Sequence, residues 1–220
     1  MNAKKAAAEQ AAERIREGMI VGLGTGSTAY WAIRRIAERV GEGLAIRAVS
    51  SSARTEQLAG ELGIPLLSLA EVDVIDIYID GADEVDGEFN LIKGGGGALL
   101  REKILAYNSQ AFVVIVDESK LVATLGKFPV PVEVVPFAVE LTLKNLAKLQ
   151  CEPSLRLENG EPYITDNGNY IIDCSFHAIP DPARLNERIR SIPGVVESGL
   201  FPGMTKSVIV GREDGTTYTP

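Results

Sequence analysis

The sequence is poor in the residues that build metal centres. It has two cysteines and one histidine among 220 residues. Cys151 and Cys174 lack the CxxC spacing of a zinc site, and nothing indicates an oxidising compartment, so we expect two free, buried thiols. Because His177 is the only histidine, a site built from several histidines is excluded, and a Ser-His or Cys-His pair has a single candidate partner. We expect it to be a structural or surface residue.

Long apolar runs are also missing. No stretch approaches eighteen uncharged apolar residues, and the N-terminal segment carries a charge every few positions. Neither a transmembrane helix nor a signal peptide is therefore indicated, and we expect a cytoplasmic protein. The net charge of −8 argues against a nucleic-acid partner. An anionic substrate would have to be held by the local field of backbone amides and one or two lysines.

The first 125 residues alternate between strand and helix patterns in the manner of βαβ units. This rhythm, ending in the apolar run 111–116, predicts a doubly wound, Rossmann-like α/β domain with a parallel sheet. The expected helices are 3–16, 28–40, 53–62 and 98–107, and the expected strands are 19–23, 45–49, 74–79 and 111–116.

The pattern changes after residue 126, where prolines at 129, 131 and 136 mark a boundary. The order strand, helix, strand, strand, helix, strand then predicts a ferredoxin-like α+β domain, with residues 165–168 as the turn between its middle strands. We expect the segment 207–211 to rejoin the first sheet. The predicted domains are therefore 1–126 plus 204–220, with 127–203 inserted.

The segment 91–104, LIKGGGGALLREKI, places four consecutive glycines directly before a predicted helix. Glycine tolerates positive φ and close approach, so this backbone can form a cradle for an anion where the helix begins. Lys93 lies at the edge of the cradle, and Glu102 follows roughly 7 Å along the helix axis. A sugar-sized ligand could touch both. For this motif alone, a flexible turn before an exposed helix face is an equal alternative.

A second glycine-rich segment, VGLGTGST at 21–28, lies between a predicted strand and a predicted helix. Ligands of open α/β sheets bind beyond the carboxyl ends of strands, where this turn lies. Its spacing departs from the dinucleotide fingerprint and from the P-loop, so it favours a small phosphate monoester over a dinucleotide. A purely structural turn remains the alternative.

An acidic segment, DGADEVD at 80–86, follows the strand 74–79. Carboxylates gathered at a strand end repel one another, which favours acid and base roles. A magnesium site and a solvated loop are the alternatives. Lys120 follows the strand 111–116, so four loops are predicted on one rim of the sheet, as in a grafted active site.

Taken in order, these segments resemble the ribose-5-phosphate isomerase family of type A. Further similarity lies in Glu118-Ser119-Lys120 and in the segments 126–129, 131–134, 165–169 and 192–196, so the resemblance spans essentially the whole chain. It implies cofactor-free interconversion of D-ribose 5-phosphate and D-ribulose 5-phosphate by a homodimer or homotetramer. The segment 211–220 matches no motif.

The resemblance also implies the residue roles. Glu102 would be the base that moves the proton between C2 and C1, Asp80 and Asp83 would assist ring opening and hydroxyl proton transfers, and Lys93 would steady the oxyanion. The implied substrate-binding set is Thr25, Gly26, Ser27, Thr28, Asp80, Gly81, Ala82, Asp83, Lys93, Gly94, Gly95, Gly96 and Lys120. Lys4 is a candidate phosphate ligand, and no metal is implied.

Three rival functions stay open at this point. They are a metal-dependent isomerase, a non-catalytic sugar-phosphate sensor, and a coenzyme A transferase or amino-sugar-phosphate deaminase of related fold. A sensor would need an appended signalling or DNA-binding domain, for which this chain is too short and too acidic.

Carboxylate proton abstraction requires fixed donors for the charge arising on oxygen, and Lys93 with the glycine amides would supply them.

Overall fold

The computed structural model describes residues 2–220, which form two compact units. The first unit contains residues up to 82 together with 101–120 and 204–220, and the second contains 83–100 and 121–203. The first holds a six-stranded sheet and the second holds smaller antiparallel sheets. The chain is therefore an α/β protein with a mixed, mostly parallel main sheet, which confirms the predicted class at this level.

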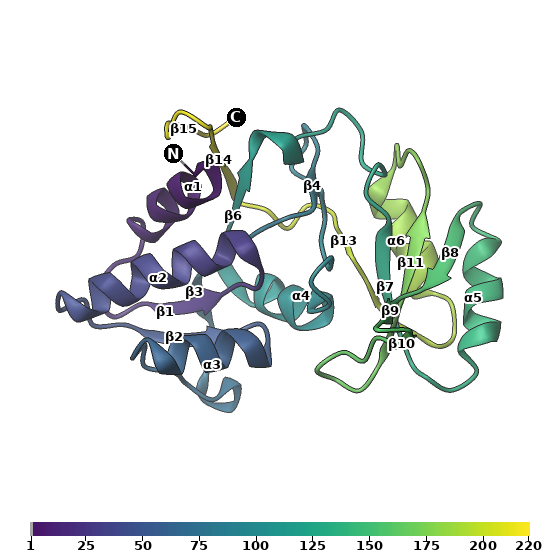
Figure 1. The fold of residues 1–220 in the computed structure, drawn as a ribbon, viewed down its shortest axis with the longest axis horizontal. Coiled ribbons are helices and arrows are strands. Elements are labelled where there is room, and N and C mark those ends of the chain that lie inside the picture. The colour runs from purple at the N-terminus through teal and green to yellow at the C-terminus, as the bar shows by residue number, and fades with distance from the viewer. Residues whose placement is uncertain (1) are drawn as a thin grey trace. The chain divides into compact units, whose positions relative to one another are not determined.

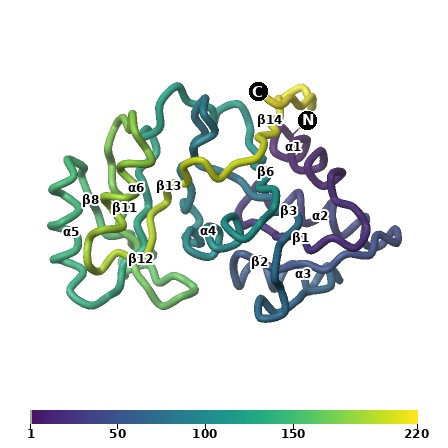
Figure 2. The backbone as a smooth tube through the Cα atoms, turned by 180° about the vertical axis from the view of Figure 1, so that it is seen from behind, coloured from purple at the N-terminus to yellow at the C-terminus, as the bar shows by residue number. Residues whose placement is uncertain are grey.

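The main sheet has the strand order β15-β14-β6-β3-β1-β2, and all its neighbours are parallel except β14 and β15. The predicted return of segment 207–211 is confirmed, because β14 pairs with β6 from Ser207 opposite Val113 to Gly211 opposite Asp117 (Figure 2). The strands are β1 (Ile20–Leu23), β2 (Arg47–Ser50), β3 (Ile75–Asp80), β6 (Ser109–Asp117), β14 (Ser207–Gly211) and β15 (Thr217–Tyr218).

The helices α1, α2 and α3 share one core with this sheet, in which Ala59 of α3 belongs to the same cluster as residues of α1 and α2 (Figure 1). The core is aliphatic: alanines of α1 pack against Ile33 and Ile36 of α2 and against strand residues such as Val21, Ile79 and Ile115. The helices of the unit are α1 (Ala3–Ala12), α2 (Ser27–Gly41) and α3 (Ala53–Glu61), and the short 3-10 helices are η1 (Leu69–Glu71) and η2 (Glu118–Lys120). α4 (Leu99–Tyr107) begins in the second unit and continues into the first.

The second unit is built on a four-stranded antiparallel sheet with the order β12-β7-β11-β8. Its strands are β7 (Val130–Val134), β8 (Glu152–Leu155), β11 (Tyr170–Ser175) and β12 (Val195–Ser198). The helices α5 (Val139–Ala147) and α6 (Pro182–Arg190) share one core with the strand residues Val132, Val134 and Ile172. Both helices therefore lie on the same face of this sheet.

Several two-residue strands are absent from the sequence prediction. β4 (Glu84–Val85), β5 (Leu91–Ile92) and β13 (Leu200–Phe201) form a sheet of their own, and β9 (Leu157–Glu158) pairs with β10 (Glu161–Pro162). The turn at 165–168 forms, since the Gly168 N–H donates to the Thr165 carbonyl at 2.9 Å. It does not join β8 directly to β11, because the β9–β10 hairpin intervenes at Asn159 and Gly160, both with positive φ.

The residues singled out by their scarcity lie as expected, with one difference. Both cysteines are free, and Cys174 is buried whereas Cys151 is only half-buried. His177, expected to be a structural or surface residue, is exposed. Within residues 2–220 no helix combines the length and apolar character needed to cross a bilayer.

Candidate active site

In the first unit, the loop after β1 leads into the N-terminus of α2. Gly26 precedes the helix with φ of 108°, a conformation that favours glycine, and among the described residues no side chain caps this end. The first N–H groups of a 15-residue helix are therefore available to an anion. Lys4 adds a cation here, because its Nζ donates to the Ser27 hydroxyl at 3.1 Å.

A cluster of hydroxyl groups also holds this loop in place. The Thr25 hydroxyl lies 2.8 Å from those of Ser51 and Ser52, and Thr55 donates to the Gly24 carbonyl at 2.9 Å. Ser52 also caps α3, as its place in the sequence indicates, by accepting from the Thr55 N–H at 3.1 Å. Sequence reasoning missed the role of this cluster, although three serines at a strand end were its signal.

Asp80, at the end of β3, is fully buried and anchors this loop. One carboxylate oxygen accepts from the Thr25 N–H at 3.0 Å and from the Gly81 N–H at 2.7 Å, and the other accepts from the Tyr78 hydroxyl. A Cβ at Gly24 would overlap the Asp80 carboxylate, so only glycine fits there. The structure thus brings the predicted 24–28 and 80–81 segments together within one unit.

Tyr78, which its sequence pattern did not single out, donates to Asp80 and lies within electrostatic range of Glu102. It is fully buried and stacks on Phe112 with ring centroids 4.9 Å apart. Burial raises the pKa of Tyr78 well above its ordinary value, and the negative charges of Asp80 and Glu102 raise it further. A hydrogen bond with Ser51 lowers this pKa, but its effect is smaller. The phenol therefore stays protonated as a donor to Asp80. Glu102, whose charge acts on it, is itself only 3% exposed.

This arrangement predicts how stability depends on pH. Because the folded-state pKa of Tyr78 is raised, its contribution is complete below about pH 10, where unfolded tyrosine is still protonated, and is lost as the pH rises further. We expect the free energy of unfolding to fall above pH 10 by up to about 1.4 kcal/mol more per pH unit than in Tyr78→Phe. Urea titrations of both proteins between pH 8 and 11.5 measure this, and equal slopes would contradict it.

In the second unit, Lys93 opens the glycine segment and is only 3% exposed. Its N–H donates to the Gly199 carbonyl at 2.8 Å, and its Nζ lies 5.6 Å from the ring centroid of Phe201. Gly94 and Gly97 have φ of 103° and 83°, and the Gly97 N–H closes a turn on the Gly94 carbonyl at 3.0 Å. Lys93 is thus part of a loop held by hydrogen bonds, and not of a flexible turn.

Asp83 is bonded directly to this loop. Its carboxylate accepts from the Gly95 N–H at 2.8 Å, while Gly95 and Gly96 remain exposed. The other acids of the predicted cluster have separate partners: Glu84 accepts from the N–H groups of Gly126 and Phe128, and Asp86 from those of Glu88 and Asn90. Glu84 and Asp86 therefore hold the backbone of their own unit.

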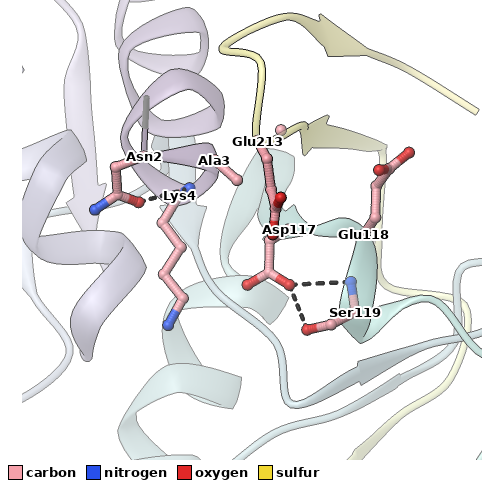
Figure 3. A pocket seen from close by; sticks show the side chains of 8 residues that line it. Asn2, Ala3, Lys4, Asp117, Glu118, Ser119 and Glu213 are labelled. Atoms are coloured by element: carbon pink, nitrogen blue, oxygen red, sulfur yellow. Dashed lines mark hydrogen bonds between the residues drawn. The ribbon is translucent and has the colours of Figure 1, made fainter.

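The remaining predicted residues of the first unit lie near the same strand ends. Thr28 and Ala82 are half-buried, and a Cβ on Gly81 would meet Thr28 at 3.8 Å. Lys120 is half-buried at the end of η2. Next to η2, a cavity of about 710 Å³ is lined by Lys4 and by Asp117, which accepts a 3.0 Å bond from the Ser119 N–H (Figure 3).

Nothing in residues 2–220 places three or more His, Cys, Asp or Glu side chains where they could hold a metal ion. The groups that the structure does offer are a helix N-terminus with a nearby lysine, a buried carboxylate beside a tyrosine–aspartate pair, and a glycine loop with a buried lysine. The helix N-terminus of the first unit makes this an α/β protein with groups suited to a small anionic ligand.

Comparison with known proteins identifies the family. The family model for ribose 5-phosphate isomerase A (phosphoriboisomerase A) matches residues 47–215. Ribose-5-phosphate isomerase A of Bacillus mycoides is 51% identical over 216 residues, covering 98% of each chain. A solved structure of the enzyme from Methanocaldococcus jannaschii has a TM-score of 0.93 and 44% identity, covering 99% of this chain and 98% of its own.

A further solved structure, of a D-ribose-5-phosphate isomerase in complex with phospho-erythronic acid, has a TM-score of 0.95 and 43% identity over the full length of both chains. The chain belongs to the ribose-5-phosphate isomerase A family, which confirms the resemblance found in the sequence. The glycine loop at 24–28 lies outside the matched part of the family model but inside the region shared with the curated relatives.

Proposed function

We propose that this isomerase interconverts D-ribose 5-phosphate and D-ribulose 5-phosphate through an enediolate, with Glu102 as the base. Membership of the family supports this reaction, whereas the roles of the individual residues are our proposal. The observation that supports them most is the burial of Glu102, 3% exposed, within electrostatic range of the Tyr78–Asp80 pair. A carboxylate at such a place can take the proton from C2 and return it to C1.

The substrate phosphate is proposed to bind at the N-terminus of α2. The N–H groups that open the helix, the hydroxyls of Ser27 and Thr28, and the Lys4 ammonium next to Ser27 are suitable donors for a monoester dianion. Thr25 contributes by holding the loop through its hydroxyl cluster. Lys120 is proposed as an additional cation for the substrate.

The charge that develops on the sugar oxygens is proposed to be met by Lys93 and the glycine segment that follows it. Lys93 supplies a cation, and the exposed N–H groups of the glycine loop supply dipoles that need no rearrangement during the reaction. Asp80 and Asp83 are proposed to accept and return the hydroxyl protons during ring opening. Each carboxylate is fixed by backbone donors, so it is already placed before substrate arrives.

Further parts of the description are also proposals. The order and antiparallel pairing of β7, β8, β11 and β12 support a ferredoxin-like domain, and the order of the main sheet supports a Rossmann-like one. The predicted division into 1–126 plus 204–220 and 127–203 is tested by expressing 127–203 alone and measuring its melting. Homodimeric or homotetrameric assembly and cytoplasmic location stay predictions, and sedimentation equilibrium tests the first.

The proposed chemistry needs no added metal, which a chelator tests. We expect the rate of ribulose 5-phosphate formation by the purified protein to be unchanged after dialysis against EDTA, because Lys93 and backbone amides would stabilise the enediolate. Matched samples dialysed without EDTA and with added Mg²⁺ serve as controls. A large loss of rate that Mg²⁺ restores would support a metal-dependent isomerase instead.

A wild-type protein that produced no ribulose 5-phosphate would contradict the proposed function altogether. The same assay with acyl-CoA or glucosamine 6-phosphate as substrate addresses the transferase and deaminase alternatives. No observation in the structure favours either of them or the sugar-phosphate sensor.

A further inference from the structure

The four-stranded sheet of the second unit has one face without helices, and the glycine loop lies against it. Side chains alternate between the faces of a strand, so Val132 and Val134 point to α5 and α6 while Pro131 points away. A Cβ on Gly94 would lie 3.2 Å from Pro131, and the Gly199 N–H donates to the Pro131 carbonyl at 2.7 Å. This open face therefore supports residues 93–97.

Arg156 connects the face to the loop by a fork of hydrogen bonds. Its Nε and Nη2 bind the two carboxylate oxygens of Asp173 at 2.9 and 2.5 Å. Its Nη1 donates to the carbonyls of Gly94 at 2.9 Å and Gly95 at 3.2 Å. The Arg156 side chain is 16% exposed, so these bonds are only weakly screened by solvent. A planar group with five fixed donors is suited to this double contact.

These bonds fix the direction of two amide groups. The Gly94 carbonyl belongs to the same planar trans peptide as the Gly95 N–H, and the Gly95 carbonyl belongs to that of the Gly96 N–H. Carbonyl and N–H point in opposite directions across such a plane. Because Arg156 binds both carbonyls, both N–H groups point away from it, and Asp83 receives the Gly95 N–H at 2.8 Å. The Gly96 N–H is thereby directed to the side opposite Arg156.

Such a clamp is needed because consecutive glycines have more backbone freedom than other residues and would otherwise sample many orientations. Tyr163 restricts the loop further, because a Cβ at Gly97 would overlap its ring and hydroxyl. Arg156 lies 5.9 Å from the Tyr163 ring centroid, so the two side chains hold the loop together.

We propose that Arg156 is a positioning residue for the isomerase reaction, and that it orients the Gly96 N–H as an oxyanion donor through its bonds to Asp173 and the loop carbonyls. The proposal rests on the proposed role of residues 94–96 in binding substrate. Arg156 itself need not touch the sugar. Its loss would leave the amide donors present but misdirected, and small misplacements of catalytic groups cost about 10²-fold in rate.

The test compares full-length Arg156→Ala and Arg156→Lys with wild type. The measured quantities are kcat/KM for ribose 5-phosphate and the inhibition constant of phospho-erythronic acid, whose carboxylate resembles the enediolate oxygens. We expect kcat/KM to fall about 10²-fold in Arg156→Ala and the inhibition constant to rise about tenfold or more. Arg156→Lys should lie between, because an ammonium cannot span Asp173 and both carbonyls.

The inhibition constant separates positioning from folding. A merely structural role lowers the fraction of active protein, which reduces the apparent kcat but leaves the inhibition constant unchanged. Arg184→Ala, an exposed arginine on α6, is the matched control and should behave as wild type. If Arg156→Ala does not fold, Arg156→Lys decides by the same criterion. An inhibition constant within about twofold of wild type overturns the proposal, whereas an inactive wild type would overturn the proposed function instead.

Discussion

Replacing Glu102 by glutamine is expected to reduce turnover by about 10² to 10⁴-fold while leaving sugar-phosphate binding largely intact. Glutamine has nearly the same shape but cannot accept the proton from C2. The phosphate and oxyanion donors are untouched, so KM should change little. Two measurements check this: kcat and KM from ribulose 5-phosphate formation, and deuterium exchange at the C2 position of the substrate in D₂O, which should slow in parallel.

The matched control for Glu102→Gln is Glu61→Gln, which makes the same change at an exposed position of α3 in the same unit. It should retain wild-type turnover and exchange. Near-normal turnover in Glu102→Gln would rule out this carboxylate as the base. Slow turnover with undiminished exchange would show that Glu102 acts in a later step.

Replacing Lys93 by methionine is expected to lower kcat by about 10² to 10³-fold, which corresponds to about 3 to 4 kcal/mol of transition-state stabilisation. Lys93 is only 3% exposed, and methionine fills a similar volume beside Phe201 but carries no ammonium group. Because the ammonium is proposed to act on the developing oxyanion, kcat and kcat/KM should fall together. Steady-state kinetics measure both.

Lys144→Met, at an exposed position of α5, is the control for this change, and the melting temperatures of all three proteins check folding. Phospho-erythronic acid should bind Lys93→Met much more weakly than wild type, since its carboxylate carries the charge that the enediolate develops. A raised KM with unchanged kcat would contradict the oxyanion role and would assign Lys93 to ground-state binding of the substrate.

The sequence supports the main elements of the fold because their apolar patterns are long. The helix that follows the 24–28 loop is recognisable from its helical periodicity, and the strand around Val113 from its continuous apolar run. Both form within two residues of the predicted bounds. Strands of two residues, such as β5 beside Lys93, carry no such period. They exist through pairing with distant segments, so propensity could not reveal them.

The candidate site divides in the same way. Loops rich in glycine or charge at strand ends are recognisable in the sequence, and Asp80, Lys93 and Glu102 could be selected on that basis. The supporting groups could not be selected: Tyr78 reads as a core strand residue, and Arg156 reads as a surface charge 62 residues from the Gly94 carbonyl that it binds. Their roles depend on contacts between segments far apart in the sequence.

The central claim is that Glu102 moves a proton between two carbons of an opened sugar whose phosphate is held at the N-terminus of α2. A crystal structure with phospho-erythronic acid bound tests it most directly. We expect the Glu102 carboxylate at about 3 to 3.5 Å from the ligand carbons that correspond to C1 and C2 of the sugar, and the ligand phosphate against the N–H groups of residues 26–28. A ligand bound away from Glu102, or with its phosphate elsewhere, would contradict the account.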